Sequence, residues 1–402
     1  MHSDKEISLK YLFFTFLKIG AISWGGFMAL VAVVQKQLVD KDKIIKEELL
    51  LDGLSLASVL PGAVAINVIT YIGYHLRGVK GALVSMFATI IPGVLMIVGL
   101  GVIYTSYGEL PVFTKFFMGI LPAISAVILS IAFSMAQKQV KDFKQIMMCL
   151  IAAICLLTIH SFFATLLVIV ASAFAGYLFY YQPGPEPEKK EIKRTPFNYR
   201  KYLLVTVILI VAVAMIAFAI TLFKIDTLGW YKINRTIFLT FSGMSLTLFG
   251  GGYVIIPAMH QVIVEGFHWL TTKEFADAIA MGQITPGPVI LSATFIGYRV
   301  AGYLGACVAT LAIFLPPGFV MILLSGFLKK IKDSNLITAI FKGMRPAIIG
   351  MIFSAAITVS KEAELVWPSA IIFLTVLILT VRFKVDVVYL IPLAGIAGIF
   401  FF

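Results

Sequence analysis

The sequence predicts an all-α polytopic membrane protein with two inverted-topology repeats of about six helices each, with broken helices, joined by one connecting transmembrane helix. Of the 402 residues, 60% are hydrophobic and 13% are charged, against about 25% charged in an ordinary soluble domain. Apolar stretches of about 17 residues or more recur along the chain, and each is long enough to cross a membrane as a helix. These continuous stretches exclude a soluble enzyme and a β-barrel, whose membrane strands alternate.

The repeat is visible as short segments that recur at a spacing of about 224 to 226 residues. Asp52 stands nine residues before Pro61, and Asp277 stands nine residues before Pro286. Further matches are Ile-Gly-Tyr at 72–74 and 296–298, and Gly-x-x-Gly-Ala at 78–82 and 302–306. Self-similarity at a fixed spacing indicates two related structural units.

A polar segment, 182–201, separates the halves and is rich in proline, glutamate and lysine, which is typical of a solvated linker. The predicted divisions are a first repeat, a cytoplasmic charged linker, a connecting transmembrane helix with its loop, and a second repeat, at 1–181, 182–201, 202–235 and 236–402.

Each half offers six candidate spans, and a proline interrupts the second span of each half, at Pro61 and Pro286. The spans are 11–34, 49–75, 81–104, 116–136, 146–159 and 162–181, then 237–259, 275–297, 302–327, 336–360, 365–381 and 387–402. With the connecting helix 202–223 we expect thirteen spans, a cytoplasmic N-terminus and an external C-terminus, because this places most Lys- and Arg-rich loops in the cytoplasm. The alternative that 49–75 and 275–297 are re-entrant hairpins stays open.

The two proline breaks form the predicted substrate site. A half-helix that begins after Pro-Gly presents unpaired N–H groups and the positive end of its dipole, which attract an anion. Matched breaks in inverted repeats form transporter sites near the bilayer midplane, so we expect both breaks to meet there and to bind an oxyanion. A kink that only shapes packing is the alternative. The backbone candidates are Pro61, Gly62, Ala63, Pro286, Gly287, Pro288 and Val289, and the side-chain donors are Ser58, Asn67, Gln283, Thr285, Ser292 and Thr294.

Two further groups of residues occupy matched places in the halves. The glycine runs Gly25-Gly26 and Gly250-Gly251-Gly252 remove side chains within a span, which allows close helix packing or a second unwound segment beside the site. Arg77 and Arg299 follow the Ile-Gly-Tyr segments, and they either guide an anion towards the breaks or anchor helices at the interface.

Asp52 and Asp277 are the candidates for proton coupling, because a charge near the membrane interior costs a few kcal/mol and requires a reason. An interfacial cap or a salt bridge is the alternative. His75 and His260 are weaker candidates at helix ends. The three cysteines lie in apolar runs without ligand spacing, so no metal and no cofactor is indicated. The net charge of +12 is attributed to cytoplasmic loops and not to a nucleic-acid partner.

The segments Phe249–Tyr253, Pro286–Val289, Ile296–Arg299 and Gly302–Ala306 resemble the signature of chromate transporters, and the first half resembles a looser copy. The whole chain is similar to the long form of that family, in which two homologous domains are fused. The resemblance implies an inner-membrane protein that exports chromate, linked to the proton gradient.

The resemblance also implies functional residues in both copies. They are Gly250 to Gly252, Pro286 to Val289 and Arg299, with Gly25, Gly26, Pro61 and Gly62 in the looser copy. The first copy departs from the pattern, since Trp24 replaces a glycine, Ala63 replaces the second proline and His75 stands in the place of Arg299.

Three functions follow as hypotheses, of which efflux of chromate or a related oxyanion comes first. A membrane-embedded enzyme is disfavoured, because the sequence has no HExxH and no nucleophile beside a base. A passive anion channel differs from a carrier in lacking dependence on a pH gradient. Sulfate has nearly the shape and charge of chromate, so the anion stays open between them. The expected partners are the anion and the lipid bilayer, with a homo-oligomer as an open alternative.

Overall fold

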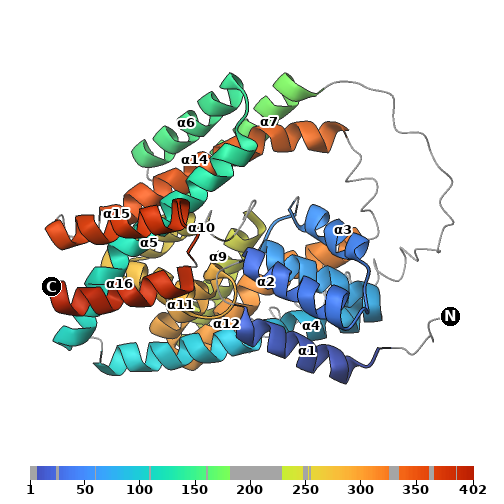
Figure 1. The fold of residues 1–402 in the computed structure, drawn as a ribbon, viewed down its shortest axis with the longest axis horizontal. Helices are drawn as coiled ribbons and strands as arrows, with labels where there is room; N and C mark the ends of the chain where they lie inside the picture. The colour runs from blue at the N-terminus through green and yellow to red at the C-terminus, as the bar shows by residue number, and fades with distance from the viewer. Residues whose placement is uncertain are drawn as a thin grey trace.

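The computed structural model is helical throughout the part of the chain that it describes (Figure 1). The described residues are 7–23, 27–58, 60–107, 110–159, 162–181, 229–247, 252, 255–325, 335–361, 366–385 and 387–402. The linker predicted at 182–201 and the connecting helix predicted at 202–223 lie outside them. The glycines Gly25, Gly26, Gly250 and Gly251 also lie outside them.

The helices of the two halves follow one another in the same order. The first half contains α1 (Leu9–Ile22), α2 (Phe27–Val34), α3 (Glu47–Ala57), α4 (Val64–Tyr107), α5 (Pro111–Gln139), α6 (Phe143–Thr158) and α7 (Phe162–Tyr180). The second half contains α9 (Gly229–Thr247), α10 (Ile255–His260), α11 (Thr272–Ile284), α12 (Ser292–Leu324), α14 (Asn335–Ser360), α15 (Trp367–Val381) and α16 (Val387–Phe401). Both α2 and α10 continue into a π-helical segment, Gln35–Lys41 and Gln261–Gly266.

Four helices among the described residues are long and apolar enough to cross a membrane, and they lie in α4, α5, α12 and α14. Of these, α4 packs against α12 and α5 packs against α14, so each central contact joins the two halves. One buried apolar cluster, which includes Ile97, Ile124, Phe295 and Ile348, runs through both. Large apolar side chains are exposed on the outer helices, such as Phe174 and Leu374, where a bilayer would cover them. The protein is therefore a polytopic helical membrane protein.

Helices α4 and α12 each contain a sharp turn at a glycine. The turn of α4 lies at Arg77 and Gly78, and that of α12 at Ala301 and Gly302. Gly78 has φ +59° and Gly302 has φ +63°, a backbone conformation that residues other than glycine rarely adopt. The boundaries that the sequence predicts near 75–81 and 297–302 agree with these turns.

Each half has a helical hairpin where the sequence predicts a broken span. Gly53 of α3 packs against the ring of Tyr71 in α4, and Glu274 of α11 forms an ion pair with Arg299 of α12. These contacts require the chain to reverse between the paired helices, at Pro61 and at Pro286. The 11 residues of α3 span only about 16 Å, which is about half the thickness of the hydrocarbon core. The chain thus reverses at both breaks, which favours the re-entrant alternative for 49–75 and 275–297 over a single crossing helix.

The first predicted span, 11–34, is also interrupted. Helix α1 ends at Ile22 and α2 begins at Phe27. The Tyr11 hydroxyl at the start of α1 donates a hydrogen bond to Asp42, just beyond the π-helical segment. The chain therefore returns towards its starting point, and 11–34 does not form one straight crossing helix. Hydropathy reports how long an apolar stretch is but not where the chain reverses, so the count of thirteen spans stays a prediction.

Each half also contains a pair of helices near its end that packs against a long helix of the opposite half. Helices α6 and α7 are antiparallel, since the Tyr180 hydroxyl donates to both carboxylate oxygens of Asp142 at 2.8 Å. Both helices pack against α14, where Gly176 contacts Gly343. In the same way, α15 and α16 both pack against α5, where Gly398 contacts Gly119. Glycine allows these helix backbones to approach closely. Because each pair packs against the opposite half, we call α6–α7 and α15–α16 the exchanged hairpins.

Candidate functional site

The turn of the second hairpin, residues 285–288, is called the second tip. Gly287 has φ +117°, which glycine adopts without steric cost. Its N–H donates to the Ser23 carbonyl at 3.0 Å, so the end of α1 in the first half contacts this tip. Gly252, the one described member of its glycine run, lies beside Val289 and Ile290. The tip is buried, and a short 3₁₀ turn, Val289–Leu291, leads from it into α12.

The turn of the first hairpin, residues 60–63, is called the first tip. Gly62 has φ +104°, which again favours glycine. The Asn67 side chain is 1% exposed, and its Nδ2 donates to the Pro61 carbonyl at 2.8 Å. This bond closes the turn from within the first turns of α4. The two tips thus share a left-handed glycine after proline but differ in how the next residues hold the turn.

Each tip packs against the long helix of the opposite half. A side chain at Gly62 would collide with Pro317 of α12, and a side chain at Gly93 of α4 would collide with the Pro286 carbonyl. Positions 93 and 317 correspond in the repeat, because Pro92 aligns with Pro316. The residues that make these contacts are uncharged. Two helix N-termini are therefore held in the interior between the halves.

The predicted side-chain donors around the second tip are also buried. The Thr285 hydroxyl donates to the Gly282 carbonyl at 3.3 Å, and the Thr294 and Thr310 hydroxyls share a hydrogen bond at 2.9 Å. Gln283 is buried as well. Ser292 is fully buried at the first residue of α12, and its Oγ has no partner among the described residues. An unpaired buried hydroxyl costs free energy, so Ser292, just beyond the tip, is a candidate donor to a ligand.

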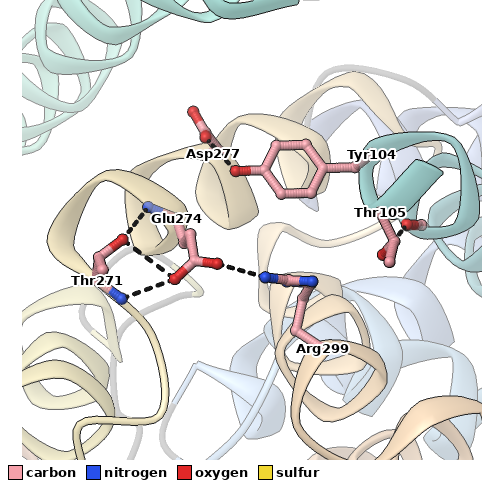
Figure 2. Close-up of polar contacts among 7 residues, drawn as sticks. Tyr104, Thr105, Thr271, Glu274, Asp277 and Arg299 are labelled. Carbon is pink, nitrogen blue, oxygen red and sulfur yellow. Dashed lines mark hydrogen bonds and ion pairs between the residues drawn. The ribbon is translucent and has the colours of Figure 1, made fainter. Parts of the chain in front are cut away.

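Asp277 lies on α11, in a polar cluster at the interface between the halves. Its side chain is 1% exposed, and Oδ2 accepts a hydrogen bond of 2.7 Å from the Tyr104 hydroxyl of α4. Figure 2 shows Tyr104 reaching from its own helix towards the α11 helix that carries Asp277. The other carboxylate oxygen, Oδ1, has no partner in the described part of the chain.

Glu274 and Arg299 join the base of the second hairpin (Figure 2). Glu274 completes a capping box with Thr271, whose side chain accepts from the Glu274 N–H at 3.2 Å. Its carboxylate also pairs with Arg299. The Arg299 guanidinium lies 5.7 Å from the centre of the Tyr104 ring. Arg299 is thus held by an acid and an aromatic ring at the base of the hairpin, on the side away from the tip.

The corresponding residues of the first half have a different arrangement. Arg77 is half-buried at the turn of α4, about 20 Å along the helix from Gly62. Asp52 is half-buried, and its neighbour Gly53 packs against Tyr71. His75 is exposed, with its ring 6.2 Å from that of Tyr71. Neither arginine lies at a tip, and the two aspartates do not have equivalent surroundings.

The structure also identifies residues that the sequence interpretation did not select. Glu274 stands three residues after Thr271, which is the sequence pattern of a capping box, so this residue could have been found. Tyr104 lies inside an apolar stretch, where a tyrosine side chain can face either the lipid or a carboxylate of another helix. The sequence alone therefore could not identify its role. Pro92 and Pro316 occupy matched positions in the repeat, and the residues after them, Gly93 and Pro317, contact the two tips.

Comparison with known proteins identifies the family. The chromate transporter family profile matches residues 10–177 and 235–399, one match in each half. The chain is 30% identical to the chromate transport protein of Cupriavidus metallidurans over 96% of this chain and 90% of that one. It is 30% identical to a probable chromate transport protein of Synechococcus elongatus over 100% and 98% of the two chains.

An uncharacterized transporter of Methanocaldococcus jannaschii is 28% identical over 99% of this chain and 96% of its own. No solved structure matches this chain significantly. The relatives are transport proteins and not enzymes, and they are covered over nearly their whole length. With matched halves, central helices that can span a membrane and family matches in both halves, this chain belongs to the chromate transporter family.

Proposed function

We propose that the protein exports chromate across the inner membrane, driven by the proton gradient. The observation that carries this proposal is the pair of buried tips, each placing a helix N-terminus in the interior and each seated on the opposite half. A helix N-terminus attracts a dianion, and the contacts at the tips come from uncharged residues that do not repel one. The names of the relatives support chromate as the anion.

Alternating exposure of the site follows from the way in which the tips are seated. Because each tip contacts the opposite long helix, a rocking motion of one half against the other would uncover the tips first towards one side and then towards the other. The matched order of helices and turns supports two repeats at 1–181 and 236–402 in inverted topology. A passive channel would not require contacts between the halves that form and break.

The proposed orientation has the N-terminus in the cytoplasm and the C-terminus outside. Lys138, Lys141 and Lys144 gather where α5 meets α6, and the linker at 182–201 is also basic. Loops rich in lysine and arginine remain on the cytoplasmic side during insertion. Cysteines introduced near Lys141 should therefore react with an impermeant thiol reagent only after the cytoplasmic face is opened.

Uptake of labelled chromate into inside-out vesicles tests the function. Vesicles that contain the full chain should accumulate chromate when a pH gradient is imposed, and a protonophore should stop the accumulation. Unlabelled sulfate in excess separates the two anions, since chromate selectivity predicts little competition and a general oxyanion carrier predicts strong competition. Equal flux with and without the gradient would instead identify a channel, and no flux above control vesicles would contradict transport of this anion.

Replacing Ser292 by alanine tests the second tip as the binding site. The change removes a buried hydroxyl that has no partner, so the fold should keep its melting temperature or gain slightly. If the hydroxyl donates to the bound dianion, the KM for chromate should rise about tenfold, since hydrogen bonds to charged groups contribute about 1.5 to 3 kcal/mol. Initial rates in vesicles and a thermal melt of the purified protein measure the two effects.

Ser85→Ala is the matched control, because Ser85 is another fully buried serine whose hydroxyl has no partner in the described structure, and it lies beside Gly73 near the turn of α4. This variant should leave the KM unchanged. An unchanged KM in both variants would remove Ser292 from the site.

A further inference from the structure

The carboxyl group of Asp277 is placed for a task that the apolar packing around it does not explain. It is almost completely buried, yet Oδ2 has a single hydroxyl partner and Oδ1 has none in the described chain. Burying a carboxyl group without satisfying both oxygens costs free energy. A site that keeps this cost therefore has a use for an oxygen atom that can take up a proton.

The hydroxyl partner of Asp277 is held rigidly in place. The Tyr104 ring packs edge-on against Phe117 and Phe295, with centroids 5.6 and 5.5 Å apart. The Arg299 guanidinium lies near the same ring, and Glu274 fixes the guanidinium (Figure 2). The ring cannot rotate away from Asp277 without disturbing these contacts, so the hydroxyl is directed at the carboxylate.

This hydrogen bond joins the two halves, and the sequence does not repeat its donor. Tyr104 belongs to α4 in the first half, and Asp277 belongs to α11 in the second. At the repeat spacing of 224 residues, the position of Tyr104 corresponds to Leu328, which has no hydroxyl. The aspartates at the matched positions also differ, because Asp52 is half-buried whereas Asp277 is buried. The halves are therefore unequal at this point.

The other charged and titratable groups around Asp277 come from several elements. Lys273 and Glu274 lie on its own helix, Arg299 lies on α12 and Tyr104 lies on α4. His260 of α10 packs against the neighbouring Phe275, and Glu265 of the π-helical segment pairs with His260 at 3.3 Å. From α5 and α16, the residues that share the apolar core with α11 are uncharged, such as Phe117 and Ile391.

We propose that Tyr104 is a positioning residue for Asp277, that Oδ1 of Asp277 takes the coupling proton, and that coupling resides in the second hairpin alone. This inference rests on the proposed proton-driven transport. The hydroxyl of Tyr104 donates to the charged carboxylate and stabilises it, so the hydrogen bond connects proton uptake to the contact between the halves. Rocking of the halves remakes this bond in each transport cycle.

The test is chromate flux into proteoliposomes that contain the purified full chain, measured over a series of pH values. Tyr104→Phe removes the donor and favours the protonated acid, so the pH of half-maximal flux should move upwards by about one unit while the maximal flux is kept. Asp277→Asn should make flux independent of the imposed pH gradient. Tyr107→Phe is the matched control, because Tyr107 lies one turn further along α4 with an exposed side chain, and its profile should match the wild type.

Infrared difference spectra of the wild type test the proposal without relying on the folding of Tyr104→Phe. A carboxyl band that is lost in Asp277→Asn should titrate at the pH of half-maximal flux. A band that titrates elsewhere, or a Tyr104→Phe profile identical to the wild type, would overturn the proposal while transport itself stands. Flux in the wild type that ignores the pH gradient would instead contradict the proposed function. Gradient dependence that is lost in Asp52→Asn and kept in Asp277→Asn would place coupling in the first hairpin.

Discussion

Gly287→Ala is expected to reduce chromate transport by about tenfold or more. Gly287 has φ +117°, and an alanine in this conformation is strained by about 1 to 3 kcal/mol. Its methyl group would also lie 3.1 Å from Leu291 Cδ1. The tip would relieve this strain by moving, which breaks the bond from the Gly287 N–H to Ser23 and displaces the start of α12. Initial rates of labelled chromate uptake into vesicles measure the loss.

Gly302→Ala separates a general effect of strain from an effect at the tip. Gly302 also has a positive φ, +63°, but no atom lies within 4 Å of an added methyl group. It stands at the base of the hairpin, away from both tips. The variant should lose similar stability in a thermal melt and retain most of its transport. Equal loss of transport in both variants would show that the second tip has no special role.

Glu274→Ala is expected to lower the stability of the protein by about 2 to 3 kcal/mol. The change removes the glutamate half of the capping box while Thr271 still caps the helix. It also leaves the partly buried Arg299 without its acid, where hydrogen bonds between charged groups contribute about 1.5 to 3 kcal/mol. The expected readout is a fall in the melting temperature of the purified protein in detergent. The base of the second hairpin should open before the long helices separate.

Glu48→Ala is the matched control, since Glu48 is an exposed acid in the first turn of the equivalent helix α3. It should change stability by less than about 0.5 kcal/mol. The exchanged pair, Glu274→Arg with Arg299→Glu, restores opposite charges but not the capping box, so it should recover part of the loss. No recovery would mean that the cap alone explains the effect.

The sequence predicted the long central helices well, because an apolar stretch of sufficient length has few other solutions in a membrane. The predicted span 116–136 lies within α5, and the repeat spacing placed the turns at Gly78 and Gly302. The direction of the chain at Pro61 was beyond this reasoning. It depends on the Asn67 bond to the Pro61 carbonyl and on the seat of Gly62 against Pro317, and the second of these contacts crosses between the halves.

The candidate site was predicted in the same uneven way. Proline followed by glycine marked both tips, because this pair both ends a helix and permits a positive φ. Asp277 was selected because charge in an apolar segment is costly, but its partner Tyr104 is 173 residues away in the chain and gives no local signal. For Arg299 the sequence left two roles open, guiding an anion or anchoring a helix, and only the fold reveals that Glu274 already pairs with it.

The exchanged hairpins have a consequence for biogenesis. Helices α6 and α7 leave the ribosome well before α14, the helix on which they rest, because Tyr180 and Asn335 are separated by roughly 150 residues. At about 5 to 20 residues per second, this interval lasts roughly ten to thirty seconds. During that time the nascent hairpin exposes Gly176 and its neighbours to lipid or to the insertion machinery. Synthesis of the carboxyl-terminal portion thus completes the architecture of the amino-terminal one, so quality control has a defined window in which to intercept unfinished chains.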